Sequence, residues 1–81
     1  MRNLEDIRAE IDEVDAQMAQ LFEKRVQLSK EAAKVKAAAG LPATDAAREI
    51  QIIENNAKLV SPEIREKYKE FQEGVLEISK K

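Results

Sequence analysis

The feature that most constrains the fold of this chain is an unbroken helical repeat that begins near its N-terminus. No Gly or Pro lies between Asn3 and Ala39, and apolar side chains recur there at alternating steps of three and four residues. This spacing aligns the side chains along one face of an α-helix and predicts a single long helix over 3–39. The apolar seam consists of Leu4, Ile7, Ile11, Val14, Met18, Leu21, Leu28, Ala32, Val35 and Ala39, with Arg25 in the one remaining position.

The length of this helix limits how the rest of the chain can pack. The helix would be about 55 Å long, whereas a globular domain of 81 residues measures about 30 Å across. The residues that follow it are too few to cover it, and only three of the 81 residues are Phe or Tyr. Because small domains bury a modest fraction of their surface, we expect a partner chain to cover the seam.

A short second helix is predicted after the long one. Gly40 and Pro42 are typical of a helix end followed by a connection. Thr44 or Asp45 is expected to cap the second helix, which should extend over about 45–57 with Ile50 and Ile53 on its inward side.

A third helix of medium length is predicted for the remaining residues. Ser61, Pro62 and Glu63 form a start signal, with Ser as the N-cap, Pro in the first helical position and an acidic residue next. The fold class is therefore all-α, with long, short and medium helices in a single domain over 1–81. The apolar face expected for the third helix comprises Ile64, Tyr68, Phe71, Val75 and Ile78.

The composition excludes several functional classes. The chain has no Cys and no His, which excludes disulfides, thiolate metal sites, hydrolytic triads and most zinc sites. Its formal net charge of −2 argues against nucleic acid as a general partner. No apolar run is long enough to span a membrane, and the N-terminus lacks a signal-peptide core, so we expect a cytoplasmic protein without a membrane partner.

Two cations on the long helix are candidates for ligand binding. Arg25 interrupts the seam, and a buried charge is costly unless it is paired. Lys36 follows eleven residues later, so both side chains project from nearly one face, about 16 Å apart along the axis. They could converge on a small anionic ligand. Two alternatives remain open: Arg25 pairs with a carboxylate of its own or a partner helix, and Lys36 is a solvated Lys near a helix C-terminus.

Arg8 and the start of the second helix complete the set of charged candidates. Arg8 lies 17 residues before Arg25, or about 25 Å along the helix, so it cannot reach the same ligand within one chain. In an antiparallel pair of long helices it would approach the partner's Arg25. Asp45 and Glu49 would favour the positive N-terminus of the second helix even without a ligand.

These residues together resemble a known family. Segments 4–15 (LEDIRAEIDEVD) and 21–25 (LFEKR) look like the first helix of the all-helical chorismate mutases. Lys36, the Gly-Leu-Pro sequence at 40–42 and the block at 45–49 (DAARE) match the order and spacing of a second set of family motifs. The resemblance covers nearly the whole chain, and each motif is weaker evidence than their combined spacing.

The resemblance implies an intertwined homodimer with two active sites, each completed by an Arg from the other chain. Arg8 matches that donated Arg, Arg25 the Arg that binds a substrate carboxylate, and Lys36 the Lys at the ether oxygen and a carboxylate. Asp45 and Glu49 match positions around the substrate hydroxyl, and Arg48 lines the same region. The resemblance thus makes Arg25, Lys36 and Glu49 catalytic, and the substrate-binding set comprises Arg8, Arg25, Lys36, Asp45, Arg48, Glu49 and Ser79.

The end of the sequence departs from the family pattern. The family has a Gln in its last helix that hydrogen-bonds the ether oxygen, often one turn after a Ser. If Ser79 matches that Ser, the Gln would fall at position 83, and a one-turn shift would instead place Ser79 at the Gln position. The expectations left open are that the sequence is trimmed, or that the natural protein continues, for example into a prephenate dehydratase domain.

The reaction implied by the family is compatible with this composition. The rearrangement of chorismate to prephenate is pericyclic and needs no nucleophile, proton relay, metal or other cofactor. It needs a compact conformer and positive charge at the ether oxygen. The alternatives are an isochorismate-pyruvate lyase or an aminodeoxychorismate mutase on the same scaffold, and a helical dimerisation or regulatory module without catalysis.

Overall fold

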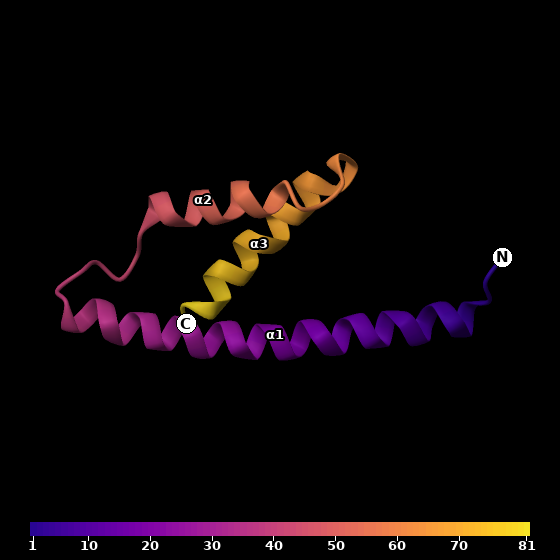
Figure 1. Ribbon diagram of the computed structural model, residues 1–81, viewed down its shortest axis with the longest axis horizontal. Helices are drawn as coiled ribbons and strands as arrows, with labels where there is room; N and C mark the ends of the chain where they lie inside the picture. Colours follow the sequence, from indigo (N-terminus) through magenta and orange to yellow (C-terminus); the bar gives the residue numbers. More distant parts are fainter.

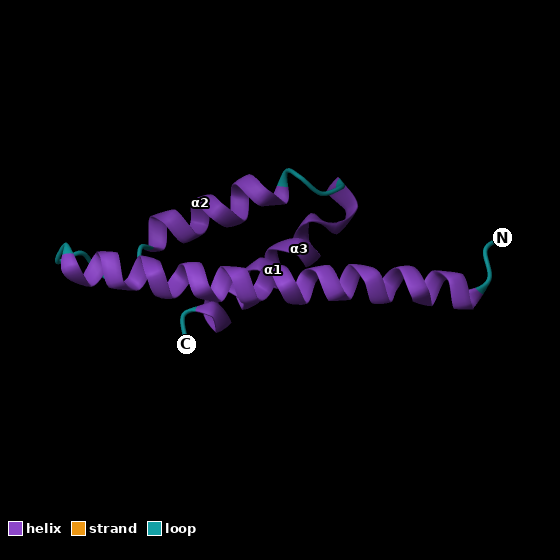
Figure 2. Ribbon diagram, turned by 60° about the horizontal axis from the view of Figure 1, so that its bottom comes forward, coloured by secondary structure: helices purple, strands orange, loops and turns teal.

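The computed structural model describes residues 1–81 and is helical with no strand. Helix α1 comprises Leu4–Ala38, α2 comprises Ala46–Ala57, the 3-10 turn η1 comprises Pro62–Ile64, and α3 comprises Arg65–Ser79. Figure 1 shows α2 and α3 as a hairpin beside α1, while the N-terminal part of α1 projects beyond them. The turned view in Figure 2 shows the same arrangement. The three predicted helices of an all-α fold are confirmed.

Local hydrogen bonds explain both ends of α1. The side chain of Asn3 accepts a hydrogen bond from the backbone N–H of Asp6 at 2.9 Å, as an N-cap does. At the other end Gly40 has a φ of +70°, in the left-handed region. The Gly40 N–H then donates to Ala37 O at 3.2 Å and the Leu41 N–H to Lys36 O at 2.8 Å, the hydrogen-bond pattern of a Schellman motif. The predicted end of this helix is confirmed.

The two shorter helices begin in different ways. Asp45, rather than Thr44, caps α2, because its Oδ1 accepts from the Arg48 N–H at 3.0 Å. The start predicted for the third helix at Ser61 is wrong in detail. The Ser61 side chain makes no capping hydrogen bond, and Pro62–Ile64 forms a separate 3-10 turn before α3 begins at Arg65. The reason is a tighter first turn, in which the Ile64 N–H donates to Ser61 O at 3.1 Å.

The interior of the single chain is very small. Four of 81 residues are buried, namely Ala57, Leu76, Gln72 and Ser79, and none belongs to α1. The seam of α1 is open to solvent, with Leu21 and Val35 both 65% exposed. Helix α3 packs against α1 and α2, whereas α1 and α2 do not approach each other closely. As predicted, the residues that follow the long helix do not cover its apolar seam.

The buried faces of the short helices differ from those predicted. Ile50 was expected on the inward side of α2 but is 62% exposed, whereas Ile53 is half-buried; Phe71 and Ile78, from the predicted apolar face of α3, are 53% and 54% exposed in the single chain. The buried face of α3 is displaced by one residue and carries Gln72, Leu76 and Ser79. The apolar face predicted for α3 is only partly covered within the chain: Tyr68 and Val75 are half-buried, whereas Phe71 and Ile78 are exposed.

A polar network fixes the α2–α3 hairpin instead of a large apolar core. The Oε1 atom of buried Gln72 accepts from Tyr68 Oη at 2.5 Å and from Asn56 Nδ2 at 3.3 Å. Arg65 Nε donates to Ala57 O at 3.1 Å. These contacts join the end of α2 to α3 and so set the direction in which α3 returns toward α1. None of the three helices combines the length and the hydropathy needed to cross a lipid bilayer.

We expect replacement of Gly40 to destabilise the chain through backbone strain alone. A Cβ at this position would meet no atom within 4 Å, so the positive φ is the source of the cost. Gly40→Ala should lower the free energy of unfolding by about 1 kcal/mol. Gly40→Asn should cost only a few tenths of that, because Asn tolerates the left-handed region. Urea unfolding at fixed protein concentration measures the stability of both variants. Equal midpoints for Ala, Asn and Gly at position 40 would show that the positive φ imposes no strain on a side chain there.

Candidate functional site

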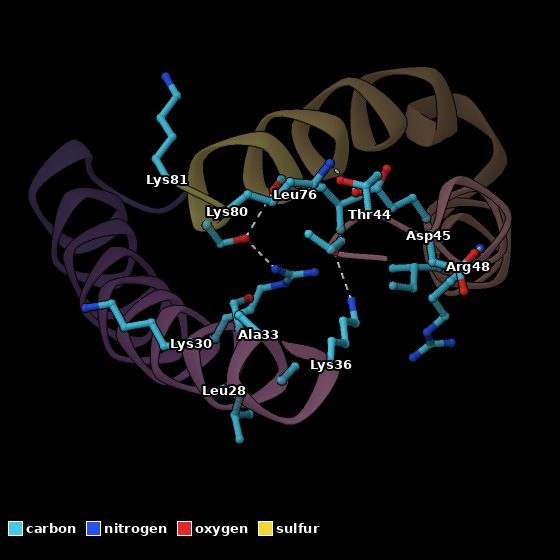
Figure 3. A pocket seen from close by; sticks show the side chains of 17 residues that line it. Leu28, Lys30, Ala33, Lys36, Thr44, Asp45, Arg48, Leu76, Lys80 and Lys81 are labelled. Carbon is cyan, nitrogen blue, oxygen red and sulfur yellow. Dashed lines mark hydrogen bonds and ion pairs between the residues drawn. The ribbon is translucent and has the colours of Figure 1, made fainter. Parts of the chain in front are cut away.

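A cleft of about 640 Å³ lies between the C-terminal half of α1, the loop before α2, the first turn of α2 and the end of α3 (Figure 3). The structure brings six of the seven predicted site residues to its wall. These are Arg25, Lys36, Asp45, Arg48, Glu49 and Ser79. The apolar part of the wall includes Leu28, Ala32, Ala33, Ile52 and Leu76.

Arg25 is held by the last turn of α3. Its Nη1 atom donates a hydrogen bond to Ser79 Oγ at 2.5 Å, a contact between residues 54 positions apart. The Ser79 hydroxyl in turn donates to Val75 O at 2.6 Å, within its own helix. Ser79 is 5% exposed, so its position is well defined. Arg25 thus has a hydroxyl partner and no carboxylate partner, which removes the intrachain ion pair considered for it from the sequence.

Lys36 lies in the last turn of α1, on the same wall of the cleft as Arg25. Its Nζ atom donates to Ala43 O at 3.3 Å across the loop, and Figure 3 shows the side chain directed toward that loop. The side chain is half-buried and forms no ion pair. The Schellman motif at Gly40 reverses the chain directly after Lys36, which is how the loop reaches this cation.

The first turn of α2 contributes three charged side chains to the opposite wall. Asp45 is occupied as the N-cap of α2, and Arg48 is exposed, with its Nη1 atom 3.4 Å from Gln51 Oε1. Glu49 forms an ion pair with Lys80, which follows the last residue of α3. At this turn the Asp45 carboxylate caps the helix, the Arg48 guanidinium is exposed, and the Glu49 carboxylate is paired with Lys80.

Arg8 is not brought to the cleft. It is exposed on the N-terminal half of α1 and does not line the cavity of its own chain. The expectation that it cannot join Arg25 within one chain agrees with this position. Its contribution to a partner's site stays a prediction.

The cleft is strongly cationic although the chain is acidic. Six Lys or Arg and two Asp or Glu side chains line it, a net charge of +4, whereas the whole chain has a net charge of −2. Five of the six cations form no ion pair. The arrangement is suited to a small anion with more than one negative group, which two separated cations can hold in one conformation.

Sequence reasoning missed three of the lining cations. Lys30, Lys80 and Lys81 were not among the predicted site residues. Lys30 and Lys81 extend outward from the edge of the cleft, whereas Lys80 reaches toward α2 (Figure 3). Lys80 could have been suspected from the sequence, because it directly follows the predicted site residue Ser79. Nothing local in the sequence indicated that the end of α3 would meet the start of α2.

Comparison with known proteins identifies relatives. Residues 7–81 match the family described as chorismate mutase type II. A protein of Haemophilus influenzae named T-protein is 43% identical over 54 residues, which cover 67% of this chain and 14% of that protein. The chain thus spans about one seventh of the length of this curated relative. No solved structure shows a significant match to the chain.

We expect Asp45 to stabilise the start of α2 as a cap and not mainly through its charge. Asp45→Ala should lower the free energy of unfolding by about 1 kcal/mol, because the Arg48 N–H loses its acceptor. Asp45→Asn keeps an equally good cap and should stay within a few tenths of a kcal/mol. Denaturant unfolding compares the two, and equal losses for Ala and Asn would show that the charge matters more than the cap.

Proposed function

The chain belongs to the chorismate mutase type II family, and we propose that it catalyses the intramolecular rearrangement of chorismate to prephenate in phenylalanine and tyrosine biosynthesis. The family match over 7–81 supports the assignment of 1–81 to one chorismate mutase domain. The proposed substrate is a small dianion with a hydroxyl group and an ether oxygen, and the reaction breaks the bond to that oxygen while a carbon–carbon bond forms.

The observation that carries the proposal is the pair Arg25 and Lys36 on one wall of a cleft, neither with a carboxylate partner. A pericyclic reaction requires no proton transfer, so catalysis depends on holding a reactive conformer and on stabilising the charge that develops. Negative charge grows on the ether oxygen as its bond breaks. Cations without a counterion lower the energy of that transition state more than cations already paired.

Arg25 is the proposed ligand of one substrate carboxylate. A guanidinium presents two parallel N–H groups that match the geometry of a carboxylate, and a Lys cannot do this. The hydrogen bond to Ser79 supports the role, because it restricts the guanidinium before substrate arrives. Ser79 contributes to binding by keeping Arg25 aligned.

Lys36 and the first turn of α2 are proposed to act on the rest of the substrate. Lys36 lies at the ether oxygen and a carboxylate, where its charge offsets the developing negative charge. Glu49 accepts a hydrogen bond from the substrate hydroxyl and orients the ring. Asp45 and Arg48 border the same region, Asp45 by shaping the turn that presents Glu49.

A homodimer is proposed to complete each site. The seam of α1 has no cover within the chain, and the N-terminal half of α1 extends beyond α2 and α3 (Figure 1). Two long helices packed antiparallel would bury both seams and bring Arg8 of one chain toward Arg25 of the other. Arg8 would then bind the second carboxylate of the substrate.

Removal of either main cation should abolish most of the turnover. We expect Arg25→Ala and Lys36→Ala each to lower kcat/KM for chorismate by about 10²-fold or more. The decrease in chorismate absorbance with time measures this turnover. Arg25→Lys should also lose most activity, because the two-pronged contact is lost. Lys34→Ala, an exposed cation two positions before Lys36, is the matched control and should keep wild-type turnover.

The assay also separates this proposal from its alternatives. Prephenate as the product supports the mutase, whereas salicylate and pyruvate from isochorismate would identify the lyase. Absence of turnover with chorismate, isochorismate and aminodeoxychorismate, in a folded protein, would favour a module without catalysis. Near-wild-type turnover by Arg25→Lys would contradict a bidentate carboxylate contact.

The shared site predicts recovery of activity when two inactive variants are mixed. In an equal mixture of Arg8→Ala and Arg25→Ala chains, half of the dimers are mixed and each contains one intact site. Activity should therefore return to about one quarter of the wild-type level. Sedimentation equilibrium checks that the chain is dimeric at the working concentration. Absence of recovery despite confirmed subunit exchange, or a folded monomer, would overturn the shared site.

A further inference from the structure

We propose that Lys80 is a positioning residue for the reaction, because its ion pair with Glu49 neutralises and fixes that carboxylate at the wall of the cleft. A dianionic substrate then meets cations and a paired carboxylate, not a free negative charge. This inference rests on the proposed chorismate mutase function and concerns a residue that the sequence did not single out.

The cations of the cleft differ in their pairing. Of the six cations that line it, Lys80 alone forms an ion pair, and its partner is Glu49. The Glu49 side chain is 25% exposed and that of Lys80 is 45% exposed. Figure 3 shows the Lys80 side chain directed from the end of α3 toward the first turn of α2. Lys80 is therefore committed to Glu49, while Arg25 and Lys36 remain available to a ligand.

A dianion in the cleft would face two carboxylates, Asp45 and Glu49. Asp45 is occupied as the N-cap of α2, where its Oδ1 atom accepts a hydrogen bond from the Arg48 N–H. Glu49 has no hydrogen-bond donor from the backbone or from a neutral side chain, so Lys80 is its partner in the structure. Without Lys80, an unpaired carboxylate would lie beside the substrate and repel it.

Lys80 lies where the end of α3 meets both walls of the cleft. The last turn of α3 presents Ser79 to Arg25 and Lys80 to Glu49. Apart from the loop between α1 and α2, which Lys36 contacts at Ala43 O, these two contacts are what joins the walls of the cleft, because the helices α1 and α2 do not approach each other closely. The end of α3 thus sets the orientation of Arg25, which is proposed to bind a substrate carboxylate, and of Glu49, which is proposed to bind the substrate hydroxyl.

An ion pair as exposed as this one contributes little to overall stability. The effect of removing it should therefore appear in substrate binding and not in folding. A residue with a merely structural role would instead change the free energy of unfolding and leave KM unaltered.

The test compares Lys80→Met, which removes the charge, with Lys80→Arg, which keeps it. We expect Lys80→Met to raise KM for chorismate about tenfold while kcat changes by less than about threefold, since repulsion acts on the bound ground state and transition state alike. Lys80→Arg should restore KM to within about threefold of wild type. Lys67→Met, on an exposed part of α3 away from the cleft, controls for the loss of one positive charge and should leave KM unchanged.

A second pair of variants tests whether Lys80 acts through Glu49. In a Glu49→Gln background no carboxylate remains to be neutralised, so adding Lys80→Met should raise KM by less than about twofold. A tenfold rise in that background would overturn the inference, as would a wild-type KM for Lys80→Met alone. A wild-type protein that does not convert chorismate would overturn the proposed function and this inference with it. An active wild type without the expected KM pattern would overturn the inference alone.

Discussion

The apolar seam of α1 is the constraint on which the rest of the structure depends. A helix of 35 residues carries apolar side chains along its whole length, yet none of its residues is buried by the chain to which it belongs. Hydrophobic burial is the main favourable contribution to folding, and two buried apolar residues, Ala57 and Leu76, cannot supply it for 81 residues. The exposed apolar residues of α2 and α3 further increase the apolar surface that the single chain leaves in water. Association with a second chain is the simplest physical remedy, and it would also explain why Arg8 lies far from the cleft of its own chain.

The cleft illustrates how an acidic chain can form a cationic site. The chain has more acidic than basic residues overall, but six Lys or Arg side chains collect around one cavity. They come from three separate parts of the chain, namely α1, the first turn of α2 and the end of α3. Net charge therefore says little about local electrostatics. What matters is that the two carboxylates at this site are occupied, one as a helix cap and the other in an ion pair.

Features of the fold that depend on short-range interactions were predictable from the sequence, whereas those that depend on tertiary contacts were not. The ends of α1 and the start of α2 are set by capping hydrogen bonds that span at most five positions, so Asn3, Gly40 and Asp45 were informative. The start of α3 was placed too early, because Ser61 and Pro62 initiate a 3-10 turn that resembles a helix start in sequence. The inward orientation of Ile50 was wrong, and Phe71 and Ile78 lie exposed on the predicted apolar face of α3, because apolar spacing identifies a face without identifying its neighbour.

Helical periodicity and capping act over a few residues, so the number of helices, their approximate ends and the common wall of Arg25 and Lys36 could be read from the amino-acid sequence. Which elements meet at the cleft depends on how the helices pack. The contact between Arg25 and Ser79 joins residues 54 positions apart, and the pair formed by Glu49 and Lys80 joins α2 to the end of α3. These contacts depend on the direction in which α3 returns, which the buried Gln72 network and the turn after α2 set. No local rule encodes that direction, so the contacts of Arg25 with Ser79 and of Glu49 with Lys80 could not be predicted from the sequence, although Arg25, Glu49 and Ser79 themselves were.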